Sequence, residues 1–197
     1  MPITAHTTAP VRRALPKESR HRDLDWGSID ALVLATLEDK VLLRDLRRLE
    51  KLELSSVWGK TERALMRHQQ VKATAVGPLE VHRRLAEGLT GESILVSSSM
   101  FLNSLVEVER FFDLSYKTIK AKLGKTLDTG VSELALRAAR ATTTAAQVLG
   151  SFDAARKYMH TRNFALGGST PAELLKTAEG ERLILNELQA HAEGAPL

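Results

Sequence analysis

Two consecutive glycines near the C-terminal end constrain this chain more than any other sequence feature. Gly167 and Gly168 can adopt positive φ angles without steric cost, so the chain can reverse sharply there. Thr170 then stands as an N-cap, Pro171 at the first helical position, and Glu173 three residues after the cap. This pattern is a capping box with a favourably placed proline. The sequence therefore predicts a rigid helical corner, which suits binding better than catalysis.

The same stretch carries a dense motif. Its core reads Thr-x-Asn-x-Ala-Leu-Gly-Gly-x-Thr-Pro-x-x-Leu-Leu over residues 161–175, and Thr177-Ala178-Glu179-Gly180 opens the next helix. With the helix expected over 179–193, these residues resemble the C-terminal toxin-binding domain of the Xre/MbcA/ParS antitoxin family. Residues 100–150 resemble the DNA-binding half of that family more loosely, and residues 1–90 match no motif that we can name.

The resemblance implies an antitoxin of a type II toxin–antitoxin pair. Its partner would commonly be a RES-type toxin, which consumes NAD or transfers ADP-ribose, and the antitoxin would cover the toxin's active site. The structural core of the module would be Asn163, Leu166, Gly167, Gly168, Thr170, Pro171 and Leu174. Direct contacts are expected from exposed groups of the last helix and from the tail to Leu197, and those helix residues are Glu181, Arg182, Asn186 and Gln189. For Leu166 and Leu174, core packing is the plainer interpretation. For the tail, the alternative interpretation is disorder.

Composition favours an all-α fold, because Leu and Ala dominate and runs of β-branched residues are short. The absence of cysteine excludes disulfides, thiolate zinc sites and a cysteine nucleophile. No apolar run approaches the ~18 residues of a membrane span, and no secretory signal follows the basic N-terminus. We therefore expect a cytoplasmic protein. The net charge of +4 permits nucleic-acid binding without requiring it.

Catalytic and cofactor signals are weak, so no enzyme activity, cofactor or metal is expected. The Gly-Lys-Thr triplets at 59–61 and 124–126 lack the upstream glycine that a phosphate-binding loop needs. The six histidines show no spacing typical of metal ligands. His160 is expected to bond a free backbone carbonyl.

We expect four regions along the chain: a flexible basic arm (1–24), a helical N-terminal region (25–92), a helix-turn-helix DNA-binding-like domain (93–150) and the toxin-binding domain (151–197).

Within the N-terminal region, Ser28 is predicted to cap a helix that starts near Ile29. Leucines at helical spacing predict a helix over 39–53, and further helices are expected over 59–72 and from Gly77-Pro78 to about Gly88. The leucine-rich segment 42–54 could form a dimer or toxin contact, although core packing is the plainer interpretation. Residues 93–99 could be a short strand or the start of a helix.

A helix-turn-helix is predicted around residue 113. Phe101, Leu105, Val108 and Phe112 follow one another at helical spacing and predict one helix. A break at Asp113-Leu114 and an N-cap then lead into a second short helix anchored by Ile119. Residues 107–120 resemble an Xre-type helix-turn-helix, whose second helix would enter the major groove. The expected DNA contacts are Ser115, Tyr116, Lys117, Thr118, Lys120, Lys122 and Lys125.

Two residues depart from that helix-turn-helix pattern. Asp113 stands where a turn glycine is usual, although Asp tolerates the left-handed conformation better than most residues. Glu109 stands where the bracing helix usually carries a small residue. The alternative interpretation is a plain helical hairpin with a solvated lysine face.

These observations together predict an all-α antitoxin that neutralises a RES-type toxin and represses its own operon by binding operator DNA. A homodimer is expected, because operator reading by such motifs usually pairs two-fold symmetry with two half-sites. The alternative is a stand-alone helix-turn-helix regulator without a toxin partner.

Overall fold

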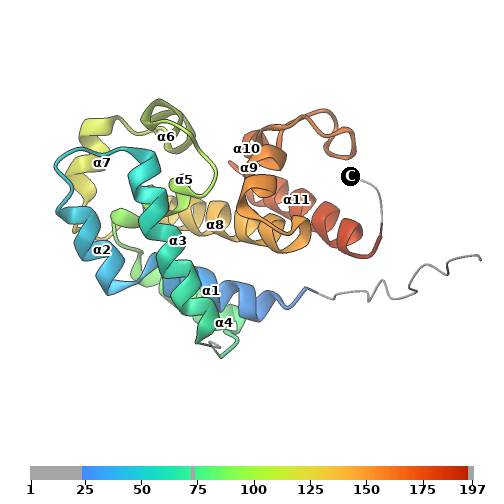
Figure 1. Ribbon diagram of the computed structural model, residues 1–197, viewed down its shortest axis with the longest axis horizontal. Helices are drawn as coiled ribbons and strands as arrows, with labels where there is room; N and C mark the ends of the chain where they lie inside the picture. Colours follow the sequence, from blue (N-terminus) through green and yellow to red (C-terminus); the bar gives the residue numbers. More distant parts are fainter. Residues whose placement is uncertain (1–23, 72–73, 195–197) are drawn as a thin grey trace, which may run out of the picture.

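The computed structural model describes residues 24–71 and 74–194. Apart from Leu24, the arm expected over 1–24 lies outside the described residues, as do the last residues of the tail. Within the described ranges every regular element is a helix, and this confirms the all-α fold class (Figure 1). The elements are α1 (Trp26–Leu37), α2 (Lys40–Arg47), α3 (Leu54–Gln70), α4 (Pro78–Glu87), α5 (Glu92–Ser99), α6 (Leu105–Phe112), α7 (Tyr116–Lys122), α8 (Thr129–Leu149), α9 (Phe152–His160), the short 3₁₀ helix η1 (Phe164–Leu166), α10 (Pro171–Leu174) and α11 (Ala178–Ala192).

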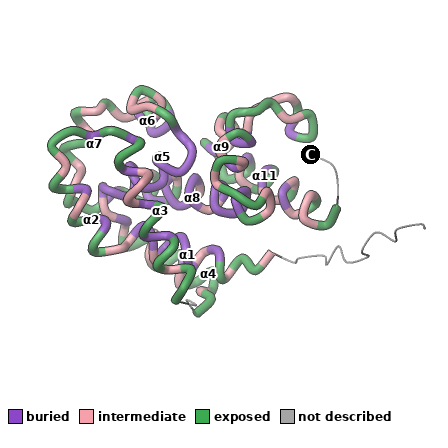
Figure 2. The backbone as a smooth tube through the Cα atoms, in the orientation of Figure 1, coloured by how far each residue is buried: buried purple, intermediate pink, exposed green. Residues whose placement is uncertain are grey.

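The centre of the fold is the pair α5 and α8. Every residue of α5 is buried, and α8 packs against it and against α1, α9 and α11 (Figure 2). Small residues on α8, such as Ala138 and Ala141, allow this close approach. The hydroxyl of Ser97 donates to Ser93 O at 2.8 Å, so a buried polar group is satisfied within the helix. The segment that could have been a strand is therefore a central core helix.

Helix α8 connects the two ends of the molecule. In Figure 1 it runs between a group that includes α2, α5, α6 and α7 and a second group of α9, α10 and α11. The buried apolar residues form one continuous cluster from Ile29 in α1 to Leu188 in α11. Leu42, Leu46 and Leu52 belong to this cluster, so core packing is the role of the leucine-rich segment in this structure.

Several helix boundaries differ from the sequence expectation. Helix α3 begins at Leu54 rather than near residue 59. Helix α1 is capped by Asp25, whose side chain accepts from Ser28 N at 3.2 Å, so Ser28 is not the cap. Helix α2 ends at Arg47 rather than near residue 53. Phe101 does not belong to the helix of Phe112, because Ser104 caps α6 and starts it at Leu105. Phe101 is instead buried before that helix.

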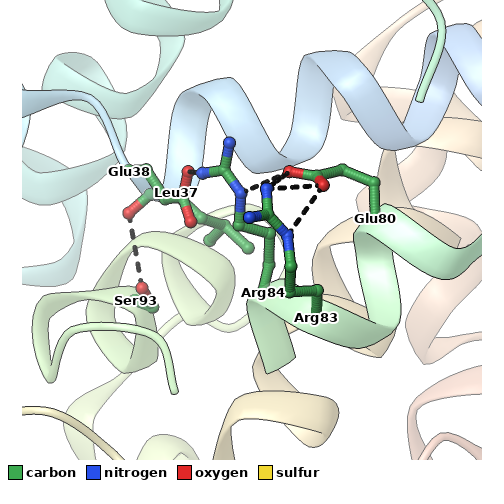
Figure 3. A network of polar contacts seen from close by, with 6 residues as sticks. All are labelled: Leu37, Glu38, Glu80, Arg83, Arg84 and Ser93. Carbon is green, nitrogen blue, oxygen red and sulfur yellow. Dashed lines mark hydrogen bonds and ion pairs between the residues drawn. The ribbon is translucent and has the colours of Figure 1, made fainter. Parts of the chain in front are cut away.

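Helix α4 is fastened to the end of α1 by charged side chains (Figure 3). Arg84 lies between Glu80 of its own helix and Glu38, the residue that follows α1. Beside this pair, the hydroxyl of Ser93 donates to Leu37 O at 3.3 Å and joins α5 to α1. The N-terminal helices are thereby fixed to the central helix pair.

Candidate functional site

The C-terminal module, residues 151–194, is organised around the predicted glycine turn. Its backbone reverses through η1, after which Gly167 and Gly168 take φ angles of 67° and 79°. Asn163 closes the reversal, because its backbone N–H donates to Ser169 O at 3.1 Å and its carbonyl accepts from Gly168 N at 2.9 Å. The left-handed conformations explain why glycine occupies both positions. The turn is held by its own backbone, as the sequence indicated.

The capping box is also present. Thr170 Oγ1 accepts from Glu173 N at 3.3 Å, and Glu173 Oε2 accepts in return from Thr170 N at 2.9 Å. Pro171 occupies the first turn and is buried. The helix that follows is a single turn, and it therefore serves to direct the chain into α11.

Helix α11 starts with a close backbone approach. Thr177 caps it by accepting from Gly180 N at 3.0 Å. A Cβ atom on Gly180 would lie 1.9 Å from Leu174 O, which is far inside van der Waals contact. Only glycine fits there, so the Thr-x-x-Gly opening sets how closely α11 packs on α10.

The middle of α11 is bonded to the glycine turn through Glu187. Its carboxylate accepts from Asn163 Nδ2 at 3.1 Å and from the hydroxyl of Tyr158 in α9. Burial, with the hydrogen bond to Glu187, raises the pKa of Tyr158, so the phenol stays a donor at neutral pH. Three segments of the module are therefore joined at one carboxylate.

A second polar cluster joins α11 to the rest of the fold. Arg140 of α8 donates to Asp30 of α1 at 2.6 Å and to Glu181 of α11 at 2.9 Å, and Arg137 lies 3.5 Å from Glu181. Burial alone would lower the pKa of Arg140, but its two carboxylate partners outweigh burial and raise it. The guanidinium is held charged between α1 and α11.

These contacts correct part of the expectation for exposed residues on the last helix. Glu181 is not exposed: its side chain is only 13% accessible and is engaged by the two arginines. Gln189 is half-buried, and its amide donates to Glu193 at 2.5 Å. Arg182 and Asn186 are exposed as expected. Glu181 therefore acts as a tie to α8 in this structure.

Phe164 is the module residue that sequence reasoning missed. It is 98% exposed, at the apex of the turn, whereas Leu166 two residues later is buried and Leu174 is half-buried against the core. One sequence feature could have identified it. Phe164 is an aromatic residue within the motif, and no helical pattern of apolar residues predicts that it is buried. A hollow of about 380 Å³ borders Phe164, and its lining also includes Leu149, Ala154, Lys157, Tyr158, Thr161, Arg162 and Asn163.

Two short helices, α6 and α7, stand where the helix-turn-helix is predicted. Asp113 takes the left-handed conformation at φ 53°, and Ser115 caps α7 by accepting from Thr118 N at 3.2 Å. Ile119 is fully buried and anchors the helix. Glu109, the residue that departed from the pattern, accepts a hydrogen bond from Tyr116 N. Its carboxylate therefore acts as a second cap on α7. This contact explains how Glu109 is accommodated at a position where the pattern usually has a small residue.

The expected DNA-contact residues fall into two groups. Lys117, Lys120 and Lys125 are exposed. Lys122 is half-buried and lies 3.6 Å from Asp128. The three residues at the start of α7 are more engaged: the hydroxyls of Ser115 and Thr118 are 2.9 Å apart, and Tyr116 packs partly against the core.

Potential metal ligands, membrane-spanning helices and His160 concern the part of the chain that the structure describes. Residues 24–71 and 74–194 contain no group of three or more potential metal-ligating side chains. No helix among the described residues is long and apolar enough to span a membrane. His160 is engaged structurally, because its Nε2 lies 2.8 Å from Phe101 O, as predicted for a carbonyl partner.

The comparisons with known proteins bear on the C-terminal module. A search of curated proteins returned no match. The family model of the antitoxin Xre/MbcA/ParS C-terminal toxin-binding domain matches residues 144–194, from the last turns of α8 through α11. This range contains the glycine turn, the capping box and the Thr-x-x-Gly opening. Residues 144–194 are therefore similar to an antitoxin toxin-binding domain, and this similarity supports a toxin-neutralising antitoxin.

Proposed function

We propose that the chain is the antitoxin of a type II pair and neutralises a RES-type toxin, which consumes NAD or transfers ADP-ribose. In this proposal the C-terminal module docks over the toxin's active site and excludes the substrate. Residues 163–174 form the rigid frame, and Arg182, Asn186 and the apex of the turn supply contacts.

The exposed Phe164 is the observation that carries the proposal. A large aromatic side chain that is 98% exposed contributes little to folding, whereas Phe, Tyr and Trp side chains contribute much of the energy of interfaces that bury them. The turn that presents it is fixed by backbone hydrogen bonds and by Asn163 on Glu187. A preformed surface loses little conformational entropy on association. Phe164 therefore suits insertion into an apolar pocket of a partner protein.

Charge around Phe164 indicates the kind of partner surface. Lys157 and Arg162 line the adjacent hollow, and both are exposed. Cations at the rim of an interface favour a partner with acidic groups and accelerate association at low salt. We expect the toxin to present an apolar pocket with acidic groups at its edge.

We further infer that the chain represses its own operon through α7 and acts as a homodimer within the toxin complex. The turn geometry of α6 and α7 and the exposure of Lys117 and Lys120 support DNA contact. Lys117→Glu with Lys120→Glu should abolish operator shifts while toxin neutralisation persists, since these lysines lie outside the matched range 144–194.

The direct experiment is co-expression with the product of the neighbouring gene, with an affinity tag on this chain alone. We expect a stoichiometric complex, and we expect the neighbouring product expressed alone to arrest growth and deplete cellular NAD. A chain that purifies alone and gives no protection would contradict the proposal. It would favour the stand-alone regulator instead.

A further inference from the structure

Positive charge is concentrated in two short segments far apart in sequence. Residues 44–51 and 117–125 together contain eight lysines and arginines and two acids, a net charge of +6. The whole chain carries only +4, so the remaining residues taken together are net negative, even though the N-terminal arm (1–24) is itself basic. The cations are Arg44, Arg47, Arg48 and Lys51 in the first segment and Lys117, Lys120, Lys122 and Lys125 in the second.

The fold brings the two segments together at the ends of α2 and α7. The buried carboxylate of Glu92 accepts from the side chain of Arg47 and, at 2.9 Å, from Gly124 N. A Cβ atom on Gly124 would lie 3.7 Å from Arg47 Nε. Lys125, next in sequence, is held by a hydrogen bond of 2.8 Å from Gly91 N to its carbonyl. One internal acid therefore fixes both segments side by side.

The cations of this region point outward. Arg44, Arg48, Lys120 and Lys125 are exposed, and Figure 1 shows α2 and α7 at the end of the molecule opposite α9–α11. Cations near helix C-termini also complement the helix dipole. The helix dipole explains cations at each helix end separately. It does not explain why the C-terminal ends of α2 and α7 lie on the same surface.

The start of α7 is less basic than its end, because two carboxylates lie there beside the exposed Lys117. Glu109 bonds Tyr116 N, and Asp113 lies exposed at the turn before the helix. Two carboxylates at the end that a reading helix would insert into the major groove disfavour close approach of phosphates there. The favourable end of α7 for a polyanion is therefore its C-terminal end.

We propose that the ends of α2 and α7 form one surface that contacts the phosphate backbone of duplex DNA, with Arg44, Arg48, Lys120 and Lys125 as its principal cations. This extends the DNA-binding part of the proposed function to the N-terminal helices, for which the sequence indicated no DNA contact. Phosphate contacts position a protein without reading sequence. Binding through this surface is accordingly strong in low salt and similar for any duplex.

The test is the salt dependence of DNA binding by the full-length chain, measured by fluorescence anisotropy on two labelled duplexes. One duplex carries the chain's own promoter and the other is an unrelated sequence of equal length. Each phosphate contact contributes about 0.9 to the slope of log Kobs against log salt concentration. Arg48→Gln should lower the slope by about 1, and Arg44→Gln with Arg48→Gln by about 2, on both duplexes.

Arg83→Gln is the matched control. Arg83 is 62% exposed on α4 and shares Glu80 with Arg84, so Glu80 keeps a partner when Arg83 is replaced. This variant should leave the slope unchanged. The circular dichroism spectra of the Arg44 and Arg48 variants should match that of the parent chain, because both arginines are exposed.

The possible results distinguish failure of this surface from failure of the proposed function. If Lys117→Glu with Lys120→Glu weakens binding and the Arg44 and Arg48 variants do not, α7 binds DNA and the composite surface is wrong. Preference for single-stranded RNA over duplex, or loss of toxin binding in the Arg44 and Arg48 variants, would assign the surface to another partner. If the parent chain binds no duplex, both this surface and the autoregulation proposal are wrong, while toxin neutralisation remains testable by itself.

Discussion

The side-chain amide of Asn163 donates a hydrogen bond of 3.1 Å to Glu187, a residue in the middle of the last helix. Because Tyr158 donates to the same carboxylate, α9, the glycine turn and α11 are fixed to one another. The family motif contains the asparagine, but its partner lies 24 positions further along the chain. The shape of the proposed toxin-binding surface therefore depends on Glu187.

Replacing Glu187 should loosen that surface. Glu187→Ala leaves the buried Tyr158 and the half-buried Asn163 without this acceptor, and we expect the free energy of unfolding to fall by about 2 kcal/mol. Urea denaturation measures the loss, and toxin affinity should fall with it. Glu179→Ala is the control, because Glu179 is 66% exposed on the same helix. Equal stability of the two variants would contradict the role of Glu187.

Two glycines in helices should respond to alanine in opposite directions. Gly180→Ala should destabilise the chain, because its Cβ would collide with the backbone carbonyl of Leu174. Gly130→Ala should stabilise it by up to about 1 kcal/mol, since the Cβ meets only ordinary contacts and alanine favours helix. Thermal unfolding of both variants provides the comparison. A Gly180→Ala protein as stable as the parent would show that α10 and α11 do not need their close approach.

Arg140 should be among the costliest polar residues to remove. Arg140→Met leaves Asp30 without its partner and Glu181 with Arg137 alone, so we expect a loss of about 3 kcal/mol in unfolding free energy. Arg182→Met removes an arginine that is 60% exposed on α11 and should cost less than about 1 kcal/mol. Chemical denaturation separates the two. A loss below that of Arg182→Met would mean that the cluster does not join α1 to α11.

Asp39 should make stability depend on acidic pH. Burial alone would raise its pKa, but the hydrogen bonds from Leu42 N, Arg67 and His68 outweigh burial and lower it. A depressed pKa stabilises the fold above the unfolded value of about 3.9, and that stabilisation disappears as pH falls through the folded pKa. Asp39→Asn should therefore reduce stability at pH 7 and flatten its decline below about pH 4. Asp153→Asn, at an exposed position on α9, is the control.

If the decline with acid is equally steep in Asp39→Asn and in the parent chain, the carboxylate contributes nothing to acid sensitivity. Urea midpoints measured at intervals from neutral to acidic pH decide the matter.

Local features were predictable from sequence where the cause was itself local. The capping box at Thr170, the left-handed Asp113 and the cap at Ser115 each depend on residues within one turn, and the structure has all three. The start of α1 was misplaced because Asp25 and Ser28 are both good caps one turn apart. Phe101 is not part of α6, although its spacing to Leu105 is helical. A buried residue of the preceding loop happens to lie four positions before the helix and extends its apolar pattern.

Features that depend on distant partners could not be read from the chain. Glu181 has the sequence character of an exposed helix residue, and only the position of Arg140, 41 residues earlier, shows that it is engaged. The exposure of Phe164 likewise follows from a turn that directs Leu166 inward and its neighbour outward. The proximity of Arg47 to Gly124 depends on the buried Glu92.

The affinity of the neighbouring gene product for Phe164→Ala tests the central claim most directly. Leu79→Ala is the matched control, because Leu79 is 80% exposed on α4 and its loss removes a similar apolar group from a surface outside the C-terminal module. By calorimetry we expect Phe164→Ala to weaken binding by about 2 kcal/mol, or about 30-fold, with an unchanged melting temperature. Leu79→Ala should bind as the parent chain does. Equal affinity of the two variants would contradict the account.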